Sequence, residues 1–185
     1  MKTRVFETIH TLNKTKEIKK MKNKNIFYLS QAAMIAALYV VLTIFISAFG
    51  LANGAIQIRI SEALTVLPFF TPAAIPGVTI GCLLSNLFTG CAPLDIVFGT
   101  CATLLGALGS YALRRYKWLV PLPPIIANII IVPYVLRFAY GAPDAIPYLM
   151  ATVGVGEVIS CYILGMMLLY ALNTFGKQLF KIENN

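Results

Sequence analysis

The sequence predicts an all-α integral membrane protein in which six transmembrane helices form one bundle. Three observations support this prediction: a high apolar content, apolar segments along most of the chain, and basic residues grouped at a few positions. Of the 185 residues, 58% are apolar and 12% are charged, and the mean hydropathy is +0.79. A soluble domain is about half apolar and about a quarter charged. The composition therefore argues against an ordinary soluble domain.

A basic arm comes before the first apolar segment. Residues 1–25 hold eight of the fifteen basic residues and lack the pattern of a packed core, so we expect a surface helix or a disordered segment there. The apolar segment that follows is too long for a secretory signal. We therefore divide the chain into this arm, a transmembrane domain over 26–172 and a tail over 173–185.

Six apolar segments make up the predicted transmembrane domain. The long segments are 26–49, 94–113, 118–136 and 147–172, and the two short ones are 57–71 and 74–90. A helix needs about 20 residues to cross a bilayer, and the short segments are also interrupted by proline and glycine. Such helices persist in a membrane only where protein surrounds them, and in transporters they often lie beside the substrate.

The positions of the basic residues orient the six segments. Cytoplasmic loops of membrane proteins carry an excess of lysine and arginine. Placing the arm in the cytoplasm also puts the loop "RRYK" (114–117) and the tail there, so that only Arg59 and Arg137 of the fifteen basic residues lie outside. Five segments would break this pattern, so we predict six, with both termini in the cytoplasm. The net charge of +8 is then a topology signal, and nucleic-acid binding explains it less well.

Polar residues within the segments are confined to the outer half and the middle of the predicted bundle. A charged side chain at the centre of a transmembrane helix costs about 2.5–3.5 kcal/mol, and such residues usually mark a ligand or ion path. Glu157 lies about ten residues, or about 15 Å, inside its segment. The candidate substrate-binding residues are Arg59, Glu62, Asn86, Asp95, Asn128, Tyr134 and Glu157, whereas Arg137 lies in the outer loop, where we expect it to be solvated.

This set contains more acceptors than cations. Carboxylates only accept hydrogen bonds, whereas asparagine also donates, so the set suits a ligand with many N–H donors or a positive charge. The same residues also have structural explanations. Arg59 can pair with Glu62 one turn on, and Asp95 can cap a helix. Asn128 and Glu157 can join helices through buried hydrogen bonds.

Four alanines form a strip of small residues on the first apolar segment. In "QAAMIAALYV", Ala32 and Ala36 are four residues apart, and so are Ala33 and Ala37. Small residues at this spacing let two helices approach closely in a membrane. The strip is therefore a contact surface, either within the bundle or with a partner.

The sequence lacks the motifs of common nucleotide-binding and hydrolytic sites. It contains no G-x-x-x-x-G-K-[ST], H-E-x-x-H or G-x-S-x-G, so we expect no catalytic residue, no metal and no cofactor. Cys82, Cys91, Cys101 and Cys161 form no C-x-x-C pair, and we interpret them as small packing residues.

Five blocks of the sequence resemble the QueT family of queuosine-precursor transporters. They are "IQIRISEALTVLPFFTPAAIPG", "GCLLSNL", "LDIVFGTCATLLGAL", "PPIIANIIIVPYV" and "VGVGEVISCYILG", within residues 28–172. The resemblance is most specific in "RISEALTVLPFF" and "LDIVFGT". QueT proteins are substrate-binding (S) components of energy-coupling-factor (ECF) transporters, so the resemblance implies a six-helix S-component bundle that is not an enzyme.

The resemblance also implies partners. An S component captures a vitamin-like solute at the outer face and docks on a transmembrane coupling subunit that two ATPase subunits drive. Ala32, Ala33, Ala36 and Ala37 match the small-residue motif by which S components pack on that subunit. The implied ligand is a 7-deazaguanine, either queuine or 7-aminomethyl-7-deazaguanine. The other expected partner is membrane lipid, and no nucleic acid is expected.

The implied ligand assigns roles to the candidate residues. A 7-deazaguanine has an edge of N–H donors, which Glu157 or Glu62 would accept, and its aminomethyl form adds a cation for Asp95. Asn86 and Asn128 would bind the carbonyl and ring nitrogens.

Aromatic and basic residues complete the expected pocket. Tyr134 or Phe69 would stack on the base. Arg59 would offset the charge of Glu62 or anchor a lid loop over residues 50–58.

Three alternatives stay open at this point. The first is an S component for another vitamin-like solute, with the same architecture. The second is a membrane enzyme that uses Glu62, Asp95 and Glu157 as acid–base or metal-binding groups. The third is an accessory membrane subunit that binds no ligand.

Overall fold

The computed structural model describes residues 2–49 and 59–175, and the regular structure in these residues is entirely helical. The predicted lid loop, residues 50–58, and most of the predicted tail lie outside the described residues. The elements are α1 (Lys2–Ala48), the 3₁₀ helix η1 (Ile60–Phe69), α2 (Ala74–Phe88), α3 (Pro93–Ala112), the short 3₁₀ turn η2 (Lys117–Leu119), α4 (Leu122–Ala139), α5 (Ile146–Glu157), the π-helical segment η3 (Val158–Leu164) and α6 (Gly165–Phe175). The predicted all-helical fold class is confirmed.

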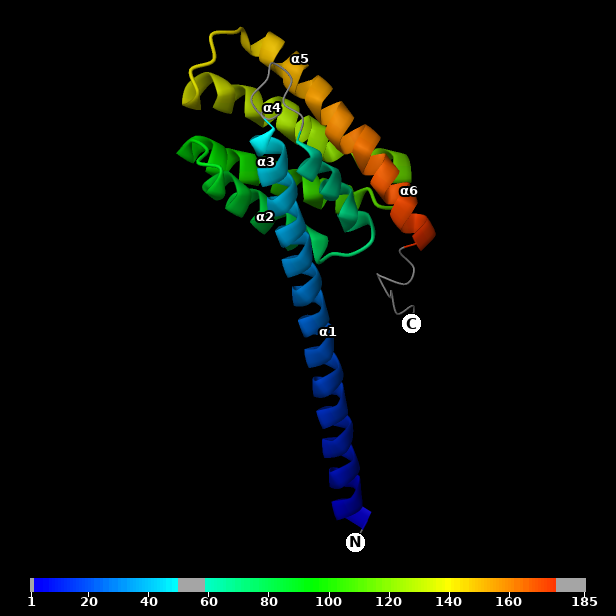
Figure 1. Cartoon of the computed structure of the whole chain (residues 1–185). Coiled ribbons are helices and arrows are strands. Elements are labelled where there is room, and N and C mark those ends of the chain that lie inside the picture. The colour runs from blue at the N-terminus through cyan, green and yellow to red at the C-terminus, as the bar shows by residue number, and fades with distance from the viewer. Residues whose placement is uncertain (1, 50–58, 176–185) are drawn as a thin grey trace.

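Helix α1 is continuous from the basic arm into the bundle. It begins at Lys2 and ends at Ala48, and its N-terminal half projects well beyond the other helices (Figure 1). The predicted division after residue 25 therefore does not coincide with a break in the helix. Only its second half, Lys24–Ala48, has the length and hydropathy of a membrane-crossing helix.

Four helical stretches are long and apolar enough to cross a membrane. They are Lys24–Ala48, Pro93–Ala112, Lys117–Ala139 and Ile146–Thr174, and each matches one of the long predicted segments. The two short segments are also helical, but they have only 10 residues in η1 and 15 residues in α2. At about 2.0 Å per residue, η1 is about 20 Å long, shorter than the hydrocarbon layer of about 30 Å. A helical membrane bundle is thus supported, and the count of six spans stays a prediction.

The short helix η1 lies inside the bundle. Its eight residues from Ser61 to Pro68 are all buried, and it contacts α1, α2, α3, α6 and η3. A 3₁₀ helix satisfies its backbone less well than an α-helix does, and in a membrane this is tolerated where protein surrounds the segment. The burial of η1 brings the side chains of its first turn into the middle of the protein.

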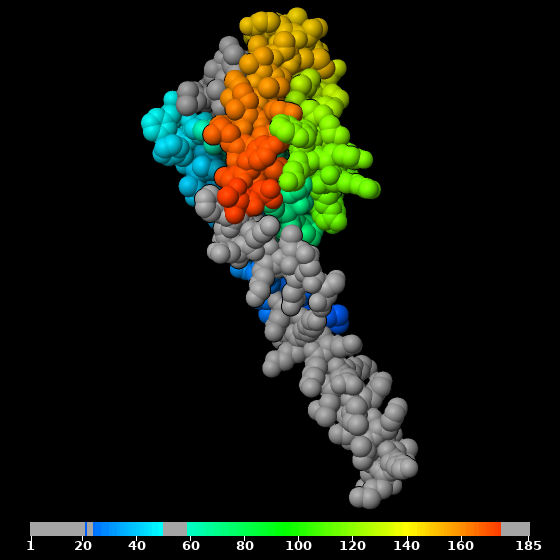
Figure 2. All heavy atoms as spheres, turned by 90° about the vertical axis from the view of Figure 1, so that its right-hand side faces the viewer, coloured from blue at the N-terminus to red at the C-terminus, as the bar shows by residue number. Residues whose placement is uncertain are grey.

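The last three helical elements form one rod along the bundle. α5, η3 and α6 follow one another without a break, and Figure 2 shows them as a band between the end of α1 and helix α4. Contacts join α4 to both α5 and η3. This rod brings Glu157, the last residue of α5, to the level of η1.

Small residues let neighbouring helices pack closely. A Cβ atom added at Gly81 in α2 would lie 2.6 Å from the Cβ of Tyr39 in α1, and one added at Gly106 in α3 would lie 2.6 Å from the Cα of Pro124 in α4. Real Cβ atoms do not approach other carbons this closely. The two helix pairs α1–α2 and α3–α4 therefore depend on these glycines.

Replacing Gly106 with alanine should destabilise the protein. The new methyl group would overlap the backbone of Pro124, which cannot rotate away, so we expect a loss of about 1–3 kcal/mol, as for other overpacked sites. Thermal unfolding of the purified protein in detergent measures this loss. Gly154→Ala is the matched control because its added Cβ would approach only the side-chain end of Ile129, at 3.2 Å. An unchanged melting temperature for Gly106→Ala would contradict the close contact between α3 and α4.

Candidate functional site

Glu62 is a carboxylate at the centre of the bundle, and only 1% of its surface is exposed. Its Oε1 atom accepts a hydrogen bond from the hydroxyl group of Tyr39 in α1 and lies 3.5 Å from the hydroxyl oxygen of Thr103 in α3. Its other oxygen, Oε2, is buried and has no hydrogen-bond partner among the described residues. A buried acceptor without a partner costs free energy. Oε2 is therefore a position at which a ligand donor would stabilise the protein.

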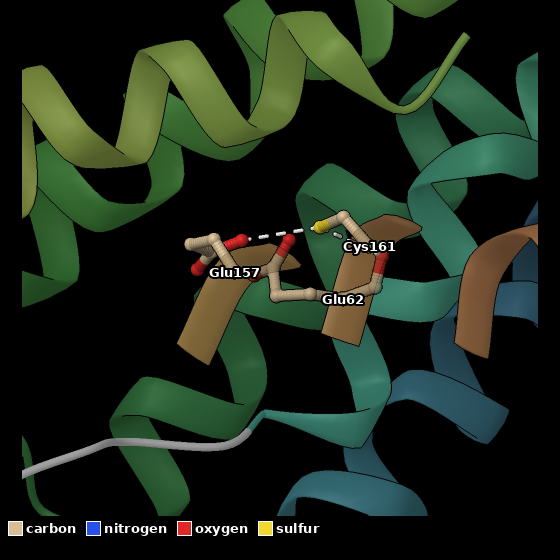
Figure 3. Close-up of side chains that lie close together, drawn as sticks. All are labelled: Glu62, Glu157 and Cys161. Carbon is tan, nitrogen blue, oxygen red and sulfur yellow. Dashed lines mark hydrogen bonds between the residues drawn. The ribbon is translucent and has the colours of Figure 1, made fainter. Parts of the chain in front are cut away.

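Glu157 and Cys161 come from the α5–η3 rod and face Glu62. The thiol group of Cys161 donates to Oε2 of Glu157 at 3.1 Å, and the side chain of Asn128 in α4 lies near Glu157. One ligand atom from each of Glu62, Glu157 and Cys161 lies within 4.8 Å of the other two. Figure 3 shows the Glu62 carboxylate pointing toward Glu157 and Cys161. These three residues are called the inner cluster below.

The backbone of the rod changes at the inner cluster. The π-helical segment Val158–Leu164 begins directly after Glu157 and contains Cys161. A π-helical turn inserts an extra residue into the helical ladder and often coincides with a functional site. In this chain it lies where the carboxylate of Glu157 turns into the bundle.

A second polar cluster lies around Asp95, in the first turn of α3. Oδ2 of Asp95 is 3.7 Å from a guanidinium nitrogen of Arg59 and accepts a hydrogen bond of 2.9 Å from the hydroxyl group of Tyr140. The side-chain amide of Asn86 lies 3.4 Å from the backbone oxygen of Asp95. Oδ1 of Asp95 is buried and has no hydrogen-bond partner among the described residues. Asp95, Asn86 and Arg59 are called the outer cluster below.

Tyr140 holds the outer cluster to the end of α4. Its hydroxyl oxygen accepts a hydrogen bond from the backbone N–H of Ala92 at 3.1 Å while its proton goes to Asp95. Burial raises the pKa of Tyr140 above its ordinary value, and the hydrogen bond to Asp95 acts in the same direction. The phenol group therefore stays protonated at neutral pH and remains a donor to Asp95.

One face of α3 connects the two clusters. Asp95, Gly99 and Thr103 are four residues apart, so they lie on the same face of the helix, and eight residues of helix separate Asp95 from Thr103 by about 12 Å. Oδ1 of Asp95 folds inward over Gly99, where an added Cβ would be only 2.8 Å away. Asp95, Gly99 and Thr103 are called the α3 strip below. Asp95 forms its outer end, and Glu62 lies against Thr103 at its inner end. Gly99, between the two ends, has no side chain.

The structure brings six of the predicted residues into these two clusters and their immediate partners. Glu62, Glu157 and Asn128 meet at the inner cluster, and Arg59, Asn86 and Asp95 meet at the outer one. Two of the structural explanations offered in the sequence analysis, the pairing of Arg59 with Glu62 and the helix cap by Asp95, are not observed. Arg59 forms its ion pair with Asp95 rather than with Glu62, and the N-cap of α3 is Ala92, without a side-chain cap hydrogen bond.

The two candidate stacking residues lie apart from the inner cluster. Tyr134 is 45% exposed and lines a groove between α3 and α4. Phe69 is at the far end of η1, about 14 Å from Glu62 at about 2.0 Å per residue, and packs against a cluster that includes Val120 and Leu169. Arg137, three residues after Tyr134 in the sequence, donates to the backbone oxygen of Ala142 at 2.7 Å. The described residues thus give neither aromatic ring a place beside the carboxylates.

Sequence reasoning did not select four residues that contact the clusters: Tyr39, Thr103, Tyr140 and Cys161. Cys161 carried a usable signal, because it follows Glu157 by four residues and so lies on the same helical face. Tyr39 is a hydroxyl-bearing residue in an apolar helix and is only 2% exposed. No pattern in the sequence connects Tyr140 with Asp95.

The inner cluster has the acceptors of a cation site. Carboxylate oxygens and a cysteine sulfur are ligands that zinc uses in proteins, and two carboxylates also bind an ammonium group through charge-assisted hydrogen bonds. The outer cluster is mixed, because it combines an acceptor oxygen with amide and guanidinium donors.

Comparisons with known proteins identify the family of the chain. The family model of the QueT transporter matches residues 29–174. The queuosine precursor transporter QueT of Lactococcus lactis subsp. cremoris (strain MG1363) is 37% identical over 98 residues, which cover 52% of this chain and 57% of that protein. No solved structure matches the chain. Because the family model spans most of its length, the chain belongs to the QueT transporter family.

Proposed function

We propose that this protein is the substrate-binding (S) component of an ECF importer and that it captures a 7-deazaguanine, either queuine or 7-aminomethyl-7-deazaguanine. The observation that carries the proposal is the pair of unpartnered, buried carboxylate oxygens on Glu62 and Asp95 in a member of a transporter family. Both oxygens are acceptors, and a 7-deazaguanine offers ring N–H and amino donors. The curated relative is named as a queuosine precursor transporter, which supports this choice of ligand.

The proposed orientation places the outer cluster on the extracellular side and both termini in the cytoplasm. Asp95 begins α3, and the basic loop with Arg114, Arg115 and Lys117 follows the other end of the same helix. Cytoplasmic loops are rich in such residues. A ligand arriving from outside would therefore meet the Asp95 end of the strip first and the Glu62 end last.

A groove on α1 and α2 is the proposed docking surface for the coupling subunit. It has a volume of about 510 Å³ and is lined almost wholly by apolar side chains, including the four alanines of the small-residue strip. Ala32 and Ala36 are buried, whereas Ala33 and Ala37 are exposed. One half of the strip thus packs within the bundle, and the other half is free for a helix of the coupling subunit. ATP hydrolysis would come from two separate ATPase subunits.

Binding measurements test the proposed ligand class. Calorimetric and thermal-shift titrations of the purified protein should give a Kd of about 1 μM or below for a 7-deazaguanine. Guanine should bind much more weakly because it lacks the substituent on position 7, and riboflavin should not bind. If folded protein bound none of the deazaguanines, the substrate would be another solute.

A bulky residue in the exposed half of the alanine strip should uncouple transport from binding. In Ala33→Trp the indole ring would fill the groove, so we expect co-purification with the coupling subunit and uptake to fall at least about tenfold, with ligand affinity unchanged. The matched control is Leu105→Trp, because Leu105 is 56% exposed on α3 and lies outside the groove. Normal uptake by Ala33→Trp would contradict this docking surface.

A further inference from the structure

The inner cluster places two carboxylates close together without a cation between them. Glu62 and Glu157 are both buried, and their ligand atoms lie within 4.8 Å of each other. Two carboxylates at this distance repel strongly when both are ionised in a medium of low dielectric constant. Among the described residues the recorded ion pair is that of Arg59, and it is with Asp95. A positive charge between the two glutamates would therefore be strongly stabilised.

The spacing of the inner cluster admits an ammonium group, and its hydrogen bonding favours that group over zinc. Acceptors that each lie about 2.8–2.9 Å from one tetrahedral nitrogen are separated by about 4.6–4.7 Å. Zinc–oxygen and zinc–sulfur bonds of about 2.0–2.3 Å would instead require ligand atoms about 3.5 Å apart. The ligand atoms all lie within 4.8 Å of one another, so this limit admits both groups. The thiol group of Cys161, however, donates to Glu157 at 3.1 Å, whereas a metal ion binds the thiolate. Glu62 Oε2, which has no hydrogen-bond partner in the part of the chain that the structure describes, is then the first acceptor for such a group.

The two clusters also differ in what they can recognise. The inner cluster offers two carboxylates, which accept only, whereas the outer cluster adds the amide of Asn86 and the guanidinium of Arg59 to the acceptor oxygen of Asp95. A primary ammonium group carries donors alone. The guanine-like edge carries N–H donors next to a carbonyl acceptor. Each end of the strip therefore matches a different end of an aminomethyl-deazaguanine.

We propose that Glu62 and Glu157 together bind the primary ammonium of the ligand's aminomethyl arm, and that Asp95, with Asn86 and Arg59, binds the guanine-like edge. This assignment reverses the roles expected from the sequence, where Asp95 was matched to the ammonium. It rests on the proposed function, because it orients the same ligand on the same strip. The backbones of Asp95 and Thr103 are about 12 Å apart along α3, and Oδ1 of Asp95 reaches inward over Gly99, so the acceptors at the two ends are closer than this, as a fused bicyclic base with a one-carbon arm requires.

This orientation makes the charge of the arm the main determinant of specificity. The nitrile analogue, 7-cyano-7-deazaguanine, has the same base but replaces the ammonium with a neutral group that only accepts. It would supply no donor to Oε2 of Glu62 and no positive charge to the two glutamates, so we expect it to bind about 100-fold more weakly than the aminomethyl form. Queuine keeps the positive charge but has a substituted amine with fewer N–H donors, so its affinity should be intermediate.

Calorimetric titration of the full chain in detergent, after treatment with a chelator, tests the proposal. The ligands are 7-aminomethyl-7-deazaguanine and its nitrile analogue, and the variants are Glu157→Gln, Glu62→Gln and Asp95→Asn. Glu157→Gln should weaken binding of the aminomethyl form and leave the nitrile form unchanged or stronger, so that the preference falls below about tenfold. Asp95→Asn should weaken both ligands by a similar factor and keep the preference. Asp144→Asn is the control, because it removes an exposed carboxylate outside both clusters.

Each other outcome has a distinct meaning. Equal affinity for the two ligands, or a preference that Asp95→Asn abolishes and Glu157→Gln retains, would overturn the assignment and leave the proposed function intact. Binding that requires added zinc would also overturn it. Failure of both ligands to bind would overturn the proposed function itself. If Glu62→Gln does not fold, the Glu157→Gln result still decides, because Glu157 lacks the hydrogen bond to Tyr39 that ties Glu62 to α1.

Discussion

The burial of carboxylates within an apolar helical bundle is the constraint on which the rest of the structure depends. Glu62 can lie at the centre only because a hydroxyl group from α1 and another from α3 surround one of its oxygens. Desolvation of such a group is costly unless it is paired. The short helix η1, the glycine contacts and the π-helical segment all place other chain segments close enough to enclose it. Its second oxygen, Oε2, has no hydrogen-bond partner among the described residues.

The two ends of the strip on α3 differ in their charge. At the outer end, one oxygen of Asp95 already contacts Arg59 and accepts a hydrogen bond from Tyr140. This end is therefore close to neutral and can bind the neutral, guanine-like edge of the ligand. At the inner end, two glutamates lie together, and the negative charge is not balanced by an adjacent ion pair among the described residues. A neutral ligand could satisfy the first end but not the second. Electrostatic balance therefore favours a ligand with a cation at one end only.

The sequence predicted the helical class, the apolar segments and six polar residues that gather into two clusters, because these follow from composition, periodicity and the cost of burying charge. It could not predict which acidic residue faces which, since that depends on how η1 folds back into the bundle. Arg59 was matched to Glu62 from their spacing, yet it pairs with Asp95 from another helix. The aromatic candidates Tyr134 and Phe69 were chosen by residue type alone. Type says nothing about the direction of a side chain.

Helix α1 belongs to both the proposed ligand site and the proposed docking groove. Tyr39 hydrogen-bonds Glu62, and its Cβ lies against Gly81 of α2 with no room for another methyl group. The exposed alanines Ala33 and Ala37 lie on the same helix, within two turns of Tyr39. A close-packed contact transmits displacement because it cannot be compressed. Under the proposed function, a cation that draws Glu62 toward Glu157 therefore acts on the hydroxyl of Tyr39, and through it on the helix that meets the coupling subunit.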